Sequence, residues 1–144
     1  MENKDLPMIT VFNASTGKET EANLIRPFSS LIWEYPQHEN PDYDDYIMTR
    51  SFECSNVIYG FICIKRHRQK PAQFTPDEDI YFSVIKGKVE VELHTSKFVL
   101  RKGGSFIVPR GNIYSITNVY KSNSILIYSY SHIQRYLAFN SEHL

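Results

Sequence analysis

The sequence predicts an all-β domain, folded as a sandwich or a barrel, on three observations. Tyr and Phe are abundant, at 10 and 9 of 144 residues, and aromatic residues favour strands. Residues 88–93 alternate strictly between polar and apolar side chains, so Val89, Val91 and Leu93 face a core while the glutamates between them face water. Short segments of this kind recur roughly every eight to twelve residues with turns between them, as in small sandwiches and barrels.

Composition limits the function classes. Sixteen Lys and Arg balance sixteen Asp and Glu, so the formal net charge is zero, whereas a domain that binds nucleic acid over its whole surface carries a positive excess. The longest apolar run has eight residues, Val57 to Ile64, and a membrane-spanning helix needs about 20. No apolar signal-peptide segment follows the N-terminus. We therefore expect neither membrane insertion nor secretion.

The first fifty residues are less regular than the rest. The segment 13–22 is polar and turn-like, and the segment 33–45 carries two prolines among acidic residues. We expect residues 1–50 to form an arm of short strands that packs on the barrel. Residues 51–133 then form the core domain, and residues 134–144 form a tail that is either a short helix or a frayed strand.

The strands of the core follow one another in short steps. A turn at 102–104 joins two of them, and a second turn at 109–112 precedes the last pair. In chain order the predicted strands are 57–64, 88–93, 97–100, 105–108, 113–119 and 124–130.

One strand is apolar on both faces. Residues 57–64 read Val-Ile-Tyr-Gly-Phe-Ile-Cys-Ile, and residues 125–128 have the same character. Because only one face of a barrel strand points inward, an apolar outer face needs a cover. The N-terminal arm or a second copy of the chain would supply it, and periodicity alone leaves both open.

The turn segment carries a family signature. Gly103, Pro109, Gly111, Tyr114 and Asn118 match the spacing G-x5-P-x-G-x2-H-x3-N of the second cupin motif, with Tyr114 in place of the metal-binding His. The segment Tyr81 to Val91 resembles the second half of the first cupin motif. The resemblance implies an all-β cupin fold, a jelly-roll β-barrel, with an N-terminal arm of short strands.

A narrower resemblance follows from the same region. The stretches 84–91, 98–100, 102–106 and 108–118 resemble the C-terminal cupin domain of the centromere protein C (CENP-C) family of inner-kinetochore scaffolds. The likeness is strong over 80–130 and faint over 1–50. It implies a nuclear protein of the centromere and kinetochore, with itself and other kinetochore proteins as partners. The family's upstream Arg-rich nucleosome-binding motif is missing from this sequence, so nucleosome or DNA contacts are expected mainly through regions outside it.

The metal site of enzymatic cupins lacks its ligands here. Those enzymes use two His and a Glu from the first motif and a His from the second. Counted forward from Gly60, the first-motif His positions fall on Arg66 and Arg68. Counted back from Gly87, the Glu position falls on Ile80, and the His positions fall on Gln73 and Thr75 or on Phe74 and Pro76. We therefore expect no metal and no other cofactor.

A metal-free cupin enzyme would need an acid–base pair that faces one pocket. Tyr114 could be the acid, but the inner-face positions offer no obvious base, and Tyr114 is more simply a side chain that fills the barrel. The sequence thus predicts no catalytic residue and no enzyme.

The resemblance implies a homodimer, and the cupin frame indicates which face forms it. If Arg66 and Arg68 stand at inward positions, then Ile58, Gly60, Ile62 and Ile64 also face in. The predicted dimer interface is therefore the outward set Val57, Tyr59, Phe61 and Cys63.

An alternative function places the site inside the barrel. Ile64, Phe82 and Tyr114 would line a cavity that binds a peptide or small ligand from a kinetochore partner. Arg66 and Arg68, in the basic run 65–70, would stand at its mouth and meet an acidic peptide or a phosphate. The competing interpretation of this run is a solvated strand end.

Overall fold

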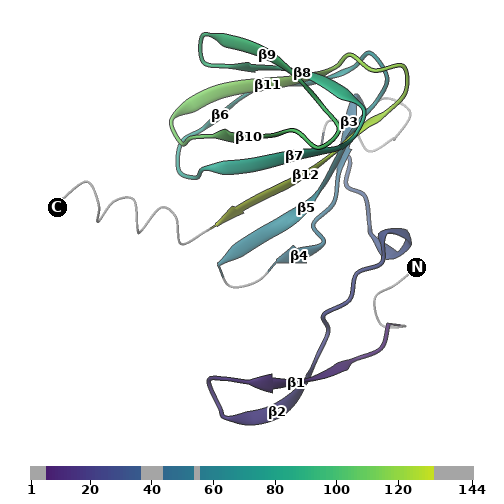
Figure 1. Ribbon diagram of the computed structural model, residues 1–144, viewed down its shortest axis with the longest axis vertical. Coiled ribbons are helices and arrows are strands. Elements are labelled where there is room, and N and C mark those ends of the chain that lie inside the picture. The colour runs from purple at the N-terminus through teal and green to yellow at the C-terminus, as the bar shows by residue number, and fades with distance from the viewer. Residues whose placement is uncertain (1–5, 37–43, 54–55, 132–144) are drawn as a thin grey trace, which may run out of the picture. The chain divides into compact units, whose positions relative to one another are not determined.

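Strands make up nearly all of the regular structure in the computed structural model, which describes residues 6–36, 44–53 and 56–131 (Figure 1). The all-β prediction is confirmed. The chain divides into two compact units, residues 1–32 and residues 33–144. No helix within the described ranges is long and apolar enough to cross a membrane. The predicted tail at 134–144 lies outside the described residues.

The smaller unit contains an antiparallel hairpin of β1 (Ile9–Asn13) and β2 (Lys18–Ala22), followed by the short 3-10 helix η2 (Phe28–Ser30). The Asn13 side-chain oxygen accepts a hydrogen bond from the Ser15 amide at 2.9 Å, and Gly17 adopts a φ of 72°, which together close the turn. β2 lies in the segment predicted to be turn-like. Its sequence lacks apolar alternation because four of its five side chains are exposed.

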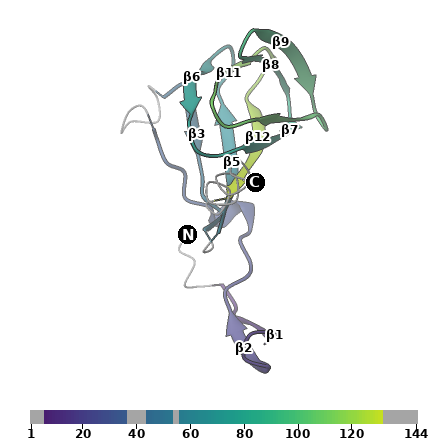
Figure 2. The ribbon, with the colours of Figure 1, turned by 90° about the vertical axis from the view of Figure 1, so that its left-hand side faces the viewer.

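The larger unit is a barrel of two sheets (Figure 2). Its six-stranded sheet has the order β10-β7-β12-β5-β3, with β4 also paired to β5. The strands of this sheet are β3 (Tyr46–Met48), β4 (Phe52–Glu53), β5 (Val57–Ile64), β7 (Ile80–Lys86), β10 (Ser105–Val108) and β12 (Ser124–Ser131).

The four-stranded sheet has the order β6-β11-β8-β9. Its members are β6 (Gln69–Thr75), β8 (Lys88–Leu93), β9 (Ser96–Arg101) and β11 (Asn112–Asn118). All six strands predicted from periodicity are present in the two sheets; three have the predicted ends, and the other three shift by one residue. β6 was not among them, because it contains Pro71 and shows no alternation. Its place at the edge of the sheet tolerates a residue without an amide proton.

The core lies between the two sheets. Val89 and Val91 are fully buried, as the alternation of β8 predicts, and Leu93 packs against the core while partly buried. Ile58, Ile62 and Ile64 on β5 are buried as well. Each such aliphatic side chain contributes about 1.5–3 kcal/mol to stability by leaving water. The inward face of β5 is therefore fixed, and its other face points out of the barrel.

Candidate functional site

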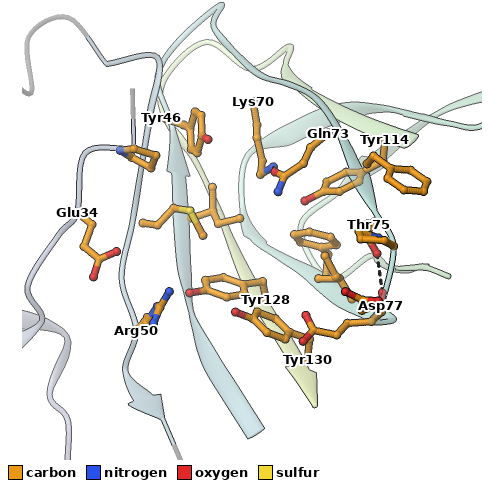
Figure 3. A pocket seen from close by; sticks show the side chains of 18 of the residues that line it. Glu34, Tyr46, Arg50, Lys70, Gln73, Thr75, Asp77, Tyr114, Tyr128 and Tyr130 are labelled. Atoms are coloured by element: carbon orange, nitrogen blue, oxygen red, sulfur yellow. Dashed lines mark hydrogen bonds between the residues drawn. The ribbon is translucent and has the colours of Figure 1, made fainter. Parts of the chain in front are cut away.

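A cavity of about 640 Å³ opens into the barrel from the side of β3 and β6. Strands of both sheets line it, together with residues 34–36 and the turn between β6 and β7. Twelve of the nineteen lining residues are aromatic or aliphatic, and the other seven are polar or charged (Figure 3). A concave apolar site with a few converging polar groups is the usual form of a ligand-binding site.

Lys70 is the buried charge of this cavity. The residue is only 3% exposed, and its ammonium lies 4.6 Å from the ring centroid of Tyr114 and 5.6 Å from that of Tyr46. It donates a hydrogen bond to the Gln73 side-chain oxygen at 2.5 Å. No described carboxylate lies within ion-pair distance of it. Burial lowers the pKa of Lys70 to about 8, so it is still mostly protonated at neutral pH.

Tyrosine hydroxyls supply most of the other buried polar groups. Tyr114 packs against Phe82 with ring centroids 5.6 Å apart, and burial raises the pKa of its phenol above the ordinary value. Burial likewise raises the pKa of Tyr128 to about 12, and its hydroxyl donates to the Thr49 carbonyl oxygen at 2.8 Å. Both phenols are therefore neutral at physiological pH, and they offer hydrogen bonds rather than charge.

The opposite side of the cavity carries charges closer to solvent. Figure 3 shows Arg50 and Glu34 across the cavity from Lys70, with Asp77 near Thr75. Arg50 forms an exposed ion pair with Glu53, with 3.5 Å between nitrogen and oxygen. A ligand that enters would pass these exposed groups before it reaches Lys70.

The structure brings together only part of the predicted cavity set. Phe82 and Tyr114 line the cavity side by side. Ile64 is fully buried in the core and does not line it. Arg66 and Arg68 also lie outside it, exposed in the turn after β5, where His67 takes a φ of 59° and the strand alternation ends. Arg68 lies 3.9 Å from Asp45.

The sequence did not predict Lys70 as a cavity residue, because Lys70 comes at the end of a run of exposed cationic residues. The sequence did contain a signal for this wall of the cavity. The possible metal-ligand positions that were counted back from Gly87 all line the cavity. They are Gln73, Phe74, Thr75, Pro76 and Ile80. Lys70 lies on the same strand as Gln73. None of these positions carries a metal ligand of the cupin type, and no group of three His, Cys, Asp or Glu within the described ranges could hold a metal ion.

The outer face of the six-stranded sheet is a second candidate site. On β5, Val57 is 39% exposed, and Tyr59, Phe61 and Cys63 are half-buried. Burial raises the pKa of the Cys63 thiol, so this group adds no charge. The neighbouring strands extend this face, because residues that pair directly across two strands point to the same side of the sheet. Four serines, Ser83, Ser105, Ser129 and Ser131, share this face with its apolar residues. The apolar residues that define the outer sheet face are Ile47, Val57, Tyr59, Phe61, Cys63, Tyr81, Ile107, Ile125 and Ile127.

Comparison with known proteins places the barrel among named relatives. A family model described as "Mif2/CENP-C like" matches residues 47–129. The chain is 38% identical over 72 residues to "Inner kinetochore subunit cnp3" of Schizosaccharomyces pombe, a match that covers 50% of this chain and 11% of that protein. It is 26% identical over 134 residues to "Centromere protein C" of Mus musculus, which covers 87% of this chain and 14% of that protein. The chain thus spans a small part of the length of these relatives.

Solved structures show the same fold. The Schizosaccharomyces pombe Cnp3 cupin domain superposes with a TM-score of 0.75 at 22% identity, covering 96% of this chain and 93% of that one. KdgF from Halomonas sp. gives a TM-score of 0.62 at 18% identity, covering 73% and 91%. An oxalate oxidase gives 0.57 at 19% identity, covering 67% and 55%. The predicted cupin fold is confirmed.

Proposed function

The chain belongs to the Mif2/CENP-C like family, and from this we propose that it is a non-catalytic cupin domain that pairs with a second copy of itself at the centromere. The names of the relatives, an inner kinetochore subunit and centromere protein C, support a location in the nucleus at the kinetochore. They also support a scaffold role rather than an enzymatic one. The absence of His and Glu from the cupin ligand positions is consistent with that role.

The observation that carries the dimer proposal is the outer sheet face. Its apolar side chains extend over five adjacent strands, from Ile47 on β3 to Ile107 on β10. Surface strands of a barrel normally carry polar residues on the outside, and a large apolar patch indicates an interaction site. A two-fold interface buries the same patch of both copies. A dimer would bring two sets of upstream segments to one centromere and raise avidity through effective concentration.

Phe61→Glu tests this interface. We expect wild-type protein to show twice the monomer mass by light scattering, and the variant to show the monomer mass while folded. A charge buried without a partner in an interface costs about 3 kcal/mol or more, which corresponds to at least a hundredfold weaker dimer. Phe61 is half-buried in the single chain, so the monomer should tolerate the carboxylate.

Ile113→Glu is the matched control. Ile113 is 56% exposed on β11 of the other sheet, and its substitution adds the same charge away from the outer sheet face. This variant should remain dimeric. A monomeric wild type would contradict the dimer proposal, and dissociation by Ile113→Glu alone would place the interface on the four-stranded sheet.

The cavity supports a second candidate function, the capture of an acidic group from a partner. The supporting observation is that Lys70 is buried as a cation with no described carboxylate to pair with. A carboxylate that enters the cavity would form a charge-assisted hydrogen bond in a low-dielectric environment. Panning a random peptide library against wild-type protein and Lys70→Met should enrich Asp- or Glu-containing peptides that bind only the wild type. Equal enrichment on both proteins would contradict this role.

Lys70→Met should also stabilise the empty domain, because it removes the cost of a buried charge. The folded-state pKa of about 8 lies below the unfolded value, so the unfolded chain holds the extra proton between about pH 8 and pH 10. Wild-type stability should therefore rise relative to the variant by about 2 kcal/mol from pH 7 to pH 9.5. Urea denaturation of both proteins at the two pH values measures this difference. A difference that is independent of pH would show that Lys70 does not titrate in this way.

A further inference from the structure

A smaller concavity lies beside the turn between β7 and β8, outside the sites already described. It has a volume of about 340 Å³ and is lined by Ile85, Lys86, Gly87, Lys88, Arg101, Lys102 and Tyr120. Four of these seven residues are cationic and none is acidic. None of the four cations lies within ion-pair distance of a described carboxylate. Lys88 and Arg101 are direct partners across β8 and β9, a placement in which like charges repel.

The backbone that carries these cations is firmly held. Lys88 donates its amide proton to the Ser124 hydroxyl at 3.2 Å, and that hydroxyl donates to the Asn118 side-chain oxygen at 2.7 Å. The Tyr120 amide donates to the same Asn118 oxygen at 2.9 Å. Gly87 has a φ of 97°, and a Cβ there would lie 2.1 Å from the Ser124 hydroxyl oxygen. The start of β8, which carries Lys88, is therefore tied to the loop between β11 and β12.

The basic run after β5 adjoins this concavity. The Arg66 amide donates to the Asn123 side-chain oxygen at 3.1 Å, and the Asn118 amide donates to the Arg68 carbonyl at 2.9 Å. These bonds tie the turn after β5 to the loop between β11 and β12, at the end of the barrel where β12 begins (Figure 1). Ile125 on β12 pairs with Cys63 on one side and with Lys86 on the other, so the end of β5 and the end of β7 lie on either side of the same residue.

Half of the chain's sixteen Lys and Arg thus gather at one end of a chain with no net charge. We define the basic end as Lys65, Arg66, Arg68, Lys86, Lys88, Arg101, Lys102 and Lys121. At the basic end, Asp45 forms an ion pair with Arg68, with 3.9 Å between Oδ1 and Nε. Another group of acids, Asp77, Glu78 and Asp79, lies in the turn between β6 and β7. The basic end therefore carries an excess of positive charge although the chain's net charge is zero.

The breadth of the basic end indicates the ligand. Its cations lie in or beside four turns, those that follow β5, β7, β9 and β11, and this array is wider than a single phosphate group requires. An array of phosphates suits it, and duplex DNA presents one negative charge about every 1.7 Å along its axis. We propose that the basic end binds the phosphate backbone of double-stranded DNA without regard to sequence. The basic end shares no residue with the outer sheet face or with the lining of the Lys70 cavity.

The test measures binding of a fluorescein-labelled duplex of arbitrary sequence by anisotropy over a range of salt concentrations. The variant Lys88→Gln/Arg101→Gln removes two charges of the basic end, and Lys18→Gln/Lys97→Gln removes two exposed charges elsewhere. At about 50 mM salt we expect the first variant to bind at least about tenfold more weakly. Its plot of log affinity against log salt should lose about two units of slope, while the control matches wild type. Circular dichroism confirms that both variants fold.

Three results would overturn the proposal. They are no wild-type binding of duplex at low salt, equal losses in both variants, and tighter binding of a phosphoserine peptide than of the duplex. The last would assign the concavity to a phosphorylated partner. Light scattering on the same samples reports the dimer separately, so a failure of DNA binding is distinguishable from a failure of the proposed function.

Discussion

Asn118→Ala is expected to lower the free energy of unfolding by about 3–5 kcal/mol, because several buried groups lose their partners together. Asn118 is 1% exposed. Its amide nitrogen donates to the Ile64 and Ser122 carbonyl oxygens, both at 2.9 Å. Its side-chain oxygen accepts from the Tyr120 amide at 2.9 Å and from the Ser124 hydroxyl at 2.7 Å. One side chain thus fastens the end of β5 to the loop that precedes β12.

Urea denaturation of wild type and Asn118→Ala measures this loss, and Asn112→Ala is the matched control. The Asn112 amide also donates to a main-chain carbonyl, that of Pro109 at 3.0 Å, but this bond is exposed to water. Water replaces such a bond at little cost, so the control should lose less than about 1 kcal/mol. Equal losses in the two variants would contradict the role assigned to Asn118.

Gly60→Ala is expected to cost about 3–4 kcal/mol, because no space exists for a methyl group at this point of β5. A Cβ at Gly60 would lie 1.9 Å from the Thr49 carbonyl oxygen and 2.8 Å from its carbon. These are backbone atoms, and two hydrogen bonds hold them against β5. The Thr49 amide donates to the Phe61 carbonyl at 2.9 Å, and the Phe61 amide donates to the Thr49 hydroxyl at 3.0 Å.

Thermal or urea unfolding of Gly60→Ala beside Gly104→Ala tests this close approach. A Cβ at Gly104 would meet its nearest atoms at 3.1 Å, a contact that small shifts relieve. The Gly104 variant should therefore lose less than about 1 kcal/mol. If Gly60→Ala had the same free energy of unfolding as wild type, the segment at Thr49 would have to move freely away from β5.

The strands that could be predicted from the sequence are those with a recognisable pattern of apolar side chains. β8 alternates because one face meets the core and the other meets water. β5 stands out through its unbroken apolar run. β2 and β6 carry no such signal, since β2 has little to bury and β6 is an edge strand that contains Pro71. Pairing with a neighbour determines these two strands, and pairing is invisible to local pattern.

The cavity was predictable in part for a similar reason. Tyr114 and Phe82 lie on strands that the cupin motifs align, so the resemblance placed them correctly beside each other. The inward placement of Arg66 and Arg68 depended on continuing the alternation of β5 beyond Ile64. β5 ends at Ile64, and residues 65–68 form a turn in which the Arg68 amide donates to the Lys65 carbonyl at 3.0 Å, so strand alternation does not carry through Arg66 and Arg68. Lys70 lies on β6 after this turn with the same parity as Ile64, and its place at the end of a run of exposed cations is what concealed its burial.

The position of β12 in the larger sheet has a consequence for how the protein folds. β12 comes last among the described strands, yet it lies between β7 and β5. Its Tyr128 hydroxyl bonds to Thr49, 79 residues earlier, and its Ser131 hydroxyl bonds to Asn56, 75 residues earlier. The apolar strand β5 therefore has no central partner until the chain has been synthesised through β12. Such long loops must close before the contacts between their ends can stabilise them. We therefore expect folding to be slow, in the range of about milliseconds to seconds. During synthesis the chain therefore exposes the apolar strand β5 until β12 emerges, and exposed strand edges of this kind are prone to aggregate.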